Sequence, residues 1–373
     1  MHVGILTGGG DCPGLNAVIR AVTLSLVRQC GARVTGIERG FHGLVERRSR
    51  PLAPADVAHI LAEGGTILGT HNACDPFRWQ GADRSADALD YARSLGLDAL
   101  VVIGGDGTMD IAHRIGQLGL PVVGVPKTID TDLPATERTF GFDSAVAVVA
   151  EALDRVATTA RSHGRVMIVE TMGRYAGWIA LAGGADAILL PELPFSVDAV
   201  AAFAKARARD NGCTLVCIAE GARAEGQGLV VRETIASSPD PLRLGGVGGW
   251  LQQQLQPRLD SEVRSTLLGH PQRGRLHAAG ARRAAAGVAA AVVAGAVRRP
   301  HAARRRALLP RAHLGRQGDR RGDVGLRGAH RARTGGPLRA PGLPVGQAVQ
   351  RRHRHGVRVA GAAGVGEPRR ARG

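Results

Sequence analysis

The sequence predicts an α/β protein with mostly parallel sheets, and three observations lead to that class. Short apolar runs alternate along the chain with segments whose apolar residues have helical spacing, which is typical of parallel sheets covered by helices on both faces. Polar, glycine-rich loops directly follow three of the apolar runs, at the strand ends where open α/β folds bind ligands. The length of 373 residues is sufficient for two domains.

The first predicted unit is a strand, a glycine loop and a helix. Residues 3–7 form a short apolar run, and residues 8–11 continue it as Gly-Gly-Gly-Asp. The helix is predicted from the spacing of its apolar residues, which are Leu15, Val18, Ile19, Val22 and Leu26. Glycines let the backbone approach a phosphate closely, and a helix N-terminus offers free N–H groups. Such turns are also common without any ligand, so this loop alone is a weak indicator.

The second loop follows the strand predicted at residues 98–103 and reads Gly-Gly-Asp-Gly-Thr over residues 104–108. It suits phosphoryl transfer, because tight backbone turns accompany one carboxylate, Asp106, that can hold Mg²⁺ near phosphate oxygens. A plain strand–helix turn capped by Asp106 is the simpler alternative. The same five residues also occur in lipid and NAD kinases, so they indicate phosphoryl transfer rather than one particular acceptor.

The third loop is the strongest indicator of chemistry. It follows the buried strand predicted at residues 121–125 and contains two carboxylates, Asp130 and Asp132, separated by one residue. If this segment is extended, both carboxylates point the same way. One of them could then accept a hydroxyl proton while the other stays near a metal ion. A solvated turn is the alternative for a lone pair of this kind.

The second half of the body continues the alternation. A helix face is predicted from Val146, Val149, Leu153 and Val156, and strands are predicted at residues 165–170, 187–190 and 215–219. Basic side chains lie at or near strand ends and in glycine-containing turns: Arg165, Arg174, Arg264, His270 and Arg273. Each alone is typical of a surface residue, but several arginines converging on one pocket suit a doubly charged phosphate.

Composition bears on location and partners. Apolar residues make up 44% of the chain and aromatic residues 3%, so the predicted core is aliphatic. No run of 18 or more apolar residues occurs, and the first residues lack a basic segment and a cleavage site, so we expect neither a membrane span nor a signal peptide. The five cysteines show no C-x-x-C spacing and are interpreted as reduced thiols of a cytoplasmic protein.

The net charge of +17 comes entirely from the last 99 residues, which carry +20 against −3 for residues 1–274. Residues 275–373 contain 23 Arg, no Lys and three acidic residues, and they lack Phe, Tyr, Trp, Ile, Met, Asn, Ser and Cys. A disordered basic tail normally uses Lys and Ser as well. A basic tail that binds nucleic acid is one interpretation, and it predicts binding with a steep salt dependence that is lost on cutting after Gly274.

The interpretation that we favour is a GC-rich gene translated out of frame after Gly274. If residues 275–279 are written with the codons CGG CTC CAC GCC GCC, a start one base later reads Gly-Ser-Thr-Pro. The same offset applied to residues 316–320 gives Gly-Lys-Val-Ile, an ordinary start of a strand. We therefore expect residues 275–373 to lack a consistent fold and not to be a native domain.

The body resembles the phosphofructokinase family. The matching stretches occur in the order of the family: TGGGDCPGLNAVIR (7–20), GGTILGT (64–70), VVIGGDGT (101–108), PKTIDTDL (126–133), FGFDSAV (140–146), ETMGRYAGWIALAGG (170–184), AEG (219–221) and LLGHPQRG (267–274). The resemblance implies two Rossmann-like three-layer lobes with the active site in the cleft between them. It places a donor lobe at residues 1–140 and a sugar-phosphate lobe at residues 141–274, and it implies transfer of a phosphoryl group to fructose 6-phosphate.

The resemblance also implies roles for individual residues. Gly10, Gly105, Asp106, Gly107 and Thr108 correspond to the donor-phosphate loops, and Asp106 to the Mg²⁺ ligand. Thr128, Ile129 and Asp130 correspond to the acceptor hydroxyl site, with Asp130 as the base and Asp132 on the metal side. The implied contacts to the sugar phosphate are Met172, Gly173, Arg174, Glu220, His270, Pro271, Gln272 and Arg273. Arg165 and Arg264 resemble a pair that reaches a neighbouring subunit's site, which implies a homotetramer or at least a dimer.

Two positions bear on the phosphoryl donor. In this family an Asp at position 107 favours pyrophosphate, whereas Gly107 leaves space for a nucleotide; Lys127, in contrast, is usual in pyrophosphate enzymes. Members with this mixture tend to use ATP, so ATP is expected and pyrophosphate is the alternative. Two departures from the family are Thr131 in place of Asn and His71-Asn72-Ala73 where an Arg near the donor is usual. An NAD or lipid kinase would not explain PKTIDTDL or GHPQRG, and a catalytically impaired remnant is a further alternative.

Overall fold

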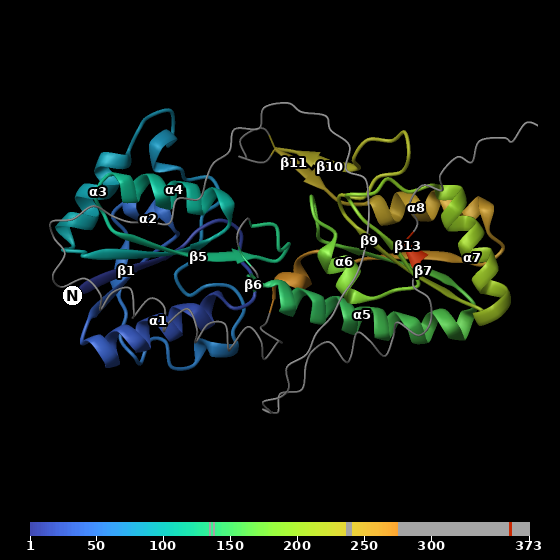
Figure 1. Cartoon of the computed structure of the whole chain (residues 1–373), viewed down its shortest axis with the longest axis horizontal. Helices are drawn as coiled ribbons and strands as arrows, with labels where there is room; N and C mark the ends of the chain where they lie inside the picture. Colours follow the sequence, from blue (N-terminus) through green and yellow to red (C-terminus); the bar gives the residue numbers. More distant parts are fainter. Residues whose placement is uncertain (134–135, 137–138, 236–240, 275–357, 360–373) are drawn as a thin grey trace, which may run out of the picture. The chain divides into compact units, whose positions relative to one another are not determined.

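The α/β class with mostly parallel sheets is confirmed by a computed structural model, which describes residues 1–133, 136, 139–235, 241–274 and 358–359. The sheet of the first lobe has the strand order β3-β2-β1-β4-β5-β6 (Figure 1). Its strands are β1 (His2–Thr7), β2 (Arg33–Ile37), β3 (Ser49–Pro51), β4 (Ala99–Gly104), β5 (Val122–Thr128) and β6 (Phe140–Gly141). Every pair is parallel except β2–β3, and the strand order reverses between β1 and β4. A crevice for ligands forms at such a reversal.

Helices cover both faces of this first sheet, as the alternating pattern predicts. α1 (Leu15–Cys30) packs on one face, and the five apolar residues that predict it are all buried. The other face is covered by α2 (Phe41–Val45), α3 (Ser85–Ser94) and α4 (Asp106–Gln117). Figure 1 shows the sheet between α1 and these three helices. The short 3₁₀ helices η1 (Ile60–Ala62) and η2 (Pro76–Arg78) lie in the connections.

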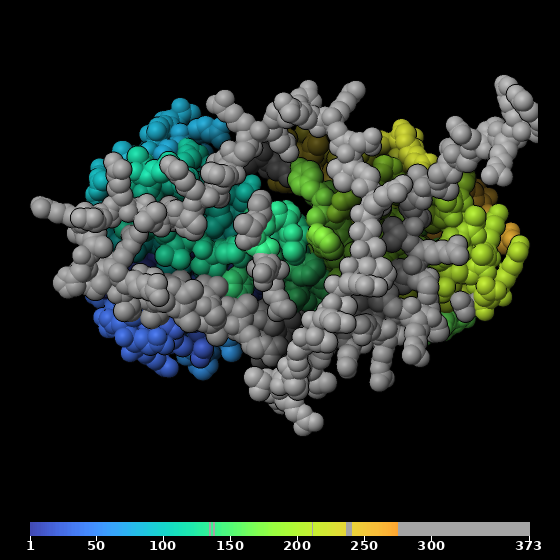
Figure 2. All heavy atoms as spheres, viewed as in Figure 1, coloured from blue at the N-terminus to red at the C-terminus, as the bar shows by residue number. Residues whose placement is uncertain are grey.

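The sheet of the second lobe is entirely parallel, in the order β12-β7-β9-β8-β13. Its strands are β7 (Val166–Thr171), β8 (Ala187–Leu189), β9 (Thr214–Ala219), β12 (Val263–Leu267) and β13 (Arg358–Val359). α5 (Phe142–His163) and α6 (Trp178–Gly183) pack on one face, and α7 (Val197–Asn211) and α8 (Val247–Leu255) pack on the other. The remaining elements are the hairpin of β10 (Val231–Thr234) and β11 (Leu242–Leu244), η3 (Gln256–Arg258) and η4 (His270–Arg273). In the space-filling view α7 lies at the surface of its lobe (Figure 2).

Two details differ from the expectation. The strand at residues 121–125 was expected to be buried, but in β5 only Val125 and Lys127 are buried, and Val123 is 37% exposed. The tail from residue 275 lies outside the described residues apart from β13, which pairs Arg358 with Ala187 and Val359 with Ile188. The expectation that this tail lacks a native fold therefore stays a prediction, with β13 as an exception to it.

Two expectations about sequence-level features can be compared with the described residues. All five cysteines lie in the described part and none forms a disulfide there. Among the described helices, none has both the length and the apolar character needed to cross a bilayer.

Candidate active site

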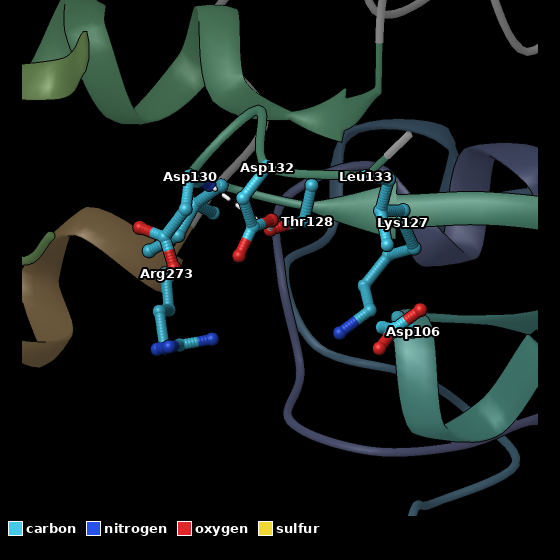
Figure 3. A pocket seen from close by; sticks show the side chains of 9 residues that line it. Asp106, Lys127, Thr128, Asp130, Asp132, Leu133 and Arg273 are labelled. Atoms are coloured by element: carbon cyan, nitrogen blue, oxygen red, sulfur yellow. Dashed lines mark hydrogen bonds between the residues drawn. The ribbon is translucent and has the colours of Figure 1, made fainter. Parts of the chain in front are cut away.

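A pocket of about 200 Å³ lies at the carboxyl ends of β4 and β5, and Arg273 of η4 contributes to its lining. Its lining consists of Gly105, Asp106, Lys127, Thr128, Ile129, Asp130, Asp132, Leu133 and Arg273. Figure 3 shows Asp106 and Lys127 at one side of the pocket and Asp130 and Arg273 at the other. The fold thus brings together residues of the second loop, the third loop and the Gln-Arg-Gly segment that the sequence analysis singled out separately.

The two glycine-rich loops are in direct contact. A Cβ atom added to Gly8 would lie 2.7 Å from Thr108 Cγ2, so only glycine lets these loops approach each other. Neither α1 nor α4 has a side chain that caps its N-terminus, which leaves backbone N–H groups available to an anion. A Cβ atom added to Gly107 would meet no atom within 4 Å, so position 107 faces open space, as the donor argument requires.

Lys127 connects the third loop to the first. Its side chain is buried, and Nζ donates a hydrogen bond of 2.5 Å to the carbonyl oxygen of Gly10. Burial lowers the pKa of this ammonium group, while the nearby Asp11 and Asp130 oppose that effect. Lys127 therefore ties the third loop to the backbone of the first glycine loop, and its side chain lines the pocket.

The turn that carries the two carboxylates is not extended, which corrects the expectation that they point the same way. Thr131 has a φ of +55°, in the left-handed region. The hydroxyl of Thr128 accepts a hydrogen bond of 3.0 Å from the N–H of Asp130 and donates one of 3.0 Å to Asp132 Oδ1. As a result Asp130 is half-buried, whereas Asp132 is exposed at the rim.

Asp130 has the electrostatic properties of a general base. Burial raises the pKa of its carboxyl group to about 6, and the charge of Asp132 adds to the shift, against the opposing effects of Arg273, Lys127 and Arg174. Its Oδ1 atom is buried and has no hydrogen-bond partner among the described residues. A base with a pKa near the working pH and an unpaired oxygen in a pocket is poised to take up a proton.

The Gln-Arg-Gly segment supplies one cation to the pocket. Arg273 Nη1 donates a hydrogen bond of 2.8 Å to the carbonyl oxygen of Asp11, which ties η4 to the first glycine loop. Gln272 is fully buried, and its Nε2 donates to the carbonyl oxygen of Gly269 at 3.2 Å, so its side chain does not line the pocket. His270 and Pro271 are exposed on η4 and also lie outside the pocket lining.

The segment after β7 carries the remaining predicted contacts, Met172, Gly173 and Arg174. Gly173 has a φ of +135°, and a Cβ atom there would lie 2.8 Å from the carbonyl oxygen of Ala176, so this turn requires glycine. Arg174 donates a hydrogen bond to the carbonyl oxygen of Leu242 in the β10–β11 hairpin. These three residues do not line the pocket around Asp130.

Glu220, at the end of β9, is electrostatically coupled to that pocket. Burial raises the pKa of its carboxyl group to about 7, and the charge of Asp130 adds to the shift while Arg174 opposes it. The charge of Arg174 thus acts on the pKa of both Asp130 and Glu220.

Arg165 and Arg264 are brought together by a residue that the sequence analysis missed. Both guanidinium groups form ion pairs with Glu262, and neither arginine lines the pocket around Asp130. Glu170 was missed as well. Its side chain is buried, and its two carboxylate oxygens accept hydrogen bonds of 2.8 Å from the N–H groups of Gly246 and Gly248 at the start of α8. The only sequence signal for Glu170 is its position as the first residue of ETMGR.

The residues at the pocket fit a magnesium ion that arrives with a phosphate donor. No group of three or more His, Cys, Asp or Glu suited to a metal ion exists in the described part of the chain. Magnesium is usually held by one or two carboxylates together with substrate phosphates. Asp106, an exposed carboxylate in the first turn of α4 that lines the pocket, meets that requirement.

Comparison with known proteins agrees with this geometry. Residues 2–296 match the description "Phosphofructokinase". The chain belongs to the phosphofructokinase family. The resemblance stated from the motifs is thereby confirmed, and the chain is assigned to a family of phosphotransferases.

The similar proteins differ in the donor that their names state. The chain is 47% identical over 278 residues to a pyrophosphate–fructose 6-phosphate 1-phosphotransferase of Amycolatopsis methanolica, which covers 74% of this chain and 81% of that protein. It is 49% identical over 287 residues to an ATP-dependent 6-phosphofructokinase of Chloroflexus aurantiacus, covering 73% and 78%. Among solved structures, Pichia pastoris phosphofructokinase in the T-state matches with a TM-score of 0.68 and 32% identity, over 79% of this chain and 32% of that chain.

Proposed function

We propose that this phosphofructokinase phosphorylates D-fructose 6-phosphate to fructose 1,6-bisphosphate with ATP and Mg²⁺. The observation that carries the proposal is Asp130, a half-buried carboxylate whose Oδ1 is unpaired among the described residues, in a pocket between a glycine-rich loop and Arg273. Asp130 removes the proton of the sugar 1-hydroxyl, the hydroxyl oxygen forms a bond to the γ-phosphorus, and the bond from that phosphorus to ADP breaks. Fructose 6-phosphate is also the acceptor in the name of the Amycolatopsis relative.

The other residues position charge around this transfer. Gly10, Gly105, Gly107 and Thr108 hold the donor phosphates with backbone and hydroxyl groups, and Asp106 holds the magnesium ion, which neutralises phosphate charge when bound. Arg273 and Arg174 stabilise the charge of the transferred group and the sugar phosphate. Met172, Gly173, Glu220, His270 and Pro271 complete the sugar-phosphate side. Gln272 was expected to bind substrate, but its burial favours a role in holding η4.

The choice of ATP rests on position 107. The open space beside Gly107 can take the inner phosphates of a nucleotide, whereas an aspartate there would fill the space and add a negative charge. Lys127 is the feature that favours pyrophosphate, and one of its ammonium N–H groups binds the carbonyl oxygen of Gly10. Pyrophosphate is the second candidate donor, because the Amycolatopsis relative is named for it.

We further propose that the protein acts in the cytoplasm as a homotetramer or dimer. Arg165 and Arg264 would then reach a neighbouring subunit's site, and their shared partner Glu262 would hold the two guanidinium groups side by side.

The test is an assay of fructose 6-phosphate phosphorylation with Mg²⁺ and either ATP or pyrophosphate, on the protein and its Asp130→Asn variant. We expect turnover with ATP, and a loss of about 10²–10⁴-fold in kcat for the variant with little change in KM. Asp110→Asn is the control and should keep full activity, because Asp110 is exposed on α4, pairs with Arg114 and does not line the pocket. A large change of KM with kcat intact would exclude Asp130 as the base, and turnover with pyrophosphate alone would exclude ATP.

A further inference from the structure

Thr131 has a backbone conformation that its side chain disfavours. Four described residues other than glycine have a positive φ, namely Arg39, Arg47, Gln80 and Thr131, and Thr131 is the only β-branched one. In the left-handed region the Cβ atom crowds the backbone, and branching at Cβ makes this worse. The strained residue lies between the two carboxylates of the pocket, Asp130 and Asp132.

The hydrogen bonds around the turn explain why Thr131 stays in this conformation. The backbone of Thr128 is held in place by two contacts. Thr128 pairs with Gly141 in β6, and its carbonyl oxygen accepts a hydrogen bond of 3.0 Å from the Thr139 hydroxyl. The Thr128 hydroxyl then binds the N–H of Asp130 and Oδ1 of Asp132. Because the Thr128 hydroxyl binds both neighbours of Thr131, the backbone has to turn at Thr131.

No hydrogen bond from the Thr131 side chain to another described residue offsets this strain. Its Oγ1 is buried and has no hydrogen-bond partner among the described residues. Oδ1 of the adjacent Asp130 is unpaired in the same way. Strained backbone and unsatisfied polar atoms together are typical of functional turns rather than of structural ones.

The left-handed turn separates the two carboxylates. Side chains two residues apart on an extended strand lie on the same face. Here Asp130 is half-buried in the pocket, whereas Asp132 is exposed and bound to the Thr128 hydroxyl. An extended Thr131 would bring both carboxylates to one side.

We propose that Thr131 is a positioning residue, whose strained left-handed conformation keeps Asp130 alone directed at the acceptor hydroxyl. The role in catalysis rests on the proposed function, whereas the strain does not. Asparagine tolerates the left-handed region better than threonine, valine keeps the branched shape but lacks the hydroxyl, and proline cannot adopt a positive φ. Thr131→Asn therefore tests the strain, Thr131→Val tests the hydroxyl group, and Thr131→Pro tests the left-handed conformation.

The experiment measures Tm, kcat and KM for fructose 6-phosphate on the full chain and the three variants. Thr131→Asn should raise Tm by about 1–3 °C, the shift expected when left-handed strain of ordinary magnitude is relieved in a chain of 373 residues, and should keep kcat within about threefold. Thr131→Val should keep the kcat of the parent and should not lower Tm, because the hydroxyl that it removes is buried and unpaired among the described residues. Thr131→Pro should lower kcat at least about 100-fold, as expected when a general base is misplaced, with KM nearly unchanged.

Three results would overturn the proposal. A lower Tm for Thr131→Asn would show that the residue is not strained. Full kcat in Thr131→Pro would show that the conformation does not matter, and a loss in Thr131→Val as large as in Thr131→Pro would make the hydroxyl itself the functional group. If near-UV circular dichroism shows that Thr131→Pro does not fold, the Tm of Thr131→Asn still tests the strain, and a kcat of Thr131→Asn far below that of the parent would contradict the positioning role. Tm needs no turnover, so an inactive parent chain would count against the proposed function and not against the strain.

Discussion

At the level of single residues, the burial of Asp130 costs stability. Its pKa is about 6 in the folded protein against an ordinary value of 3.8, mainly because burial disfavours the charged carboxylate. The folded state therefore binds a proton more tightly than the unfolded state does. The cost is absent below about pH 4 and complete above about pH 6, where the carboxylate is ionised in both states.

The variant Asp130→Asn should be more stable than the parent at pH 8. Removing the buried charge is expected to raise the free energy of unfolding by at most about 3 kcal/mol, since one pKa unit corresponds to about 1.4 kcal/mol. At pH 4 the gain should vanish, because Asp130 is then protonated in the folded protein. Thermal melts at pH 4 and pH 8 measure this, with Asp110→Asn as the exposed control. An equal Tm difference at both pH values would mean that the Asp130 carboxylate is not destabilised by burial.

At the level of elements, Glu170 couples β7 to α8. The carboxylate sits at the end of β7 and accepts hydrogen bonds from Gly246 and Gly248, so it caps a helix that has no capping side chain of its own. A Cβ atom on Gly248 would lie 3.1 Å from Glu170 Oε2, so the fit is close. The charge of Glu170 also suits the positive end of the helix dipole.

Glu170→Gln should destabilise the protein by about 1–3 kcal/mol, because the amide has one acceptor and must place an NH₂ group against a backbone N–H. Guanidinium chloride unfolding at pH 7 measures the change. The matched control is Glu151→Gln on α5, which removes only an exposed pair with Arg155 and should cost about 0–1 kcal/mol. Equal effects of the two variants would mean that Glu170 does not cap α8.

The same elements show how far the sequence could be interpreted. Strands such as β1 and β4 were predicted because a local apolar run suffices to indicate a buried strand, and α1 because its apolar spacing is helical. The extension of β5 to Thr128 was not predicted, because it depends on pairing with β6, twelve or more residues further along the chain. The left-handed Thr131 was missed because the Thr128 hydroxyl, not the residue type at 131, determines that turn.

The ion pairs and caps were the least predictable part of the site. Glu262 meets Arg165 across 97 positions of sequence, and Glu170 meets Gly246 across 76. No local sequence pattern indicates such contacts, since they form only when β7, β12 and α8 pack together. The pocket residues were predictable because they lie in motifs at the end of a strand or shortly after it.

At the level of the whole molecule, the described part leaves apolar surface uncovered. Tyr175 is 72% exposed and Trp178 is 51% exposed at the start of α6, and Val123 of β5 is 37% exposed. Both sheets end in the described part with two-residue strands, β6 and β13, which satisfy few backbone groups of their neighbours. Exposed aromatic residues and weakly paired sheet edges favour association or an additional covering segment.

The unusual composition of residues 275–373 suggests why this apolar surface is uncovered. The Amycolatopsis relative matches 74% of this chain and only 81% of its own length, so each protein has a remainder without a counterpart in the other. The Arg-, Ala- and Gly-rich tail has no Ile, Phe or Tyr with which to cover apolar surface. The frame shifted by one base after Gly274 begins with Gly-Ser-Thr-Pro and, at residues 316–320, regains an Ile in Gly-Lys-Val-Ile with the codons written above.

We therefore expect the protein with the restored frame to be more stable and more active than the chain of the present sequence. The comparison uses Tm and fructose 6-phosphate phosphorylation with ATP, on the two purified proteins side by side. Truncation after Gly274 is the matched control, because it removes the tail without replacing it. Activity only in the restored protein, with equal Tm for the present and truncated chains, would show that the present tail adds nothing to the fold. The match to the family continues to residue 296, beyond Gly274, and favours the opposite result. If the present chain is as active as the restored one, its tail is a tolerated native end and the shifted frame is wrong.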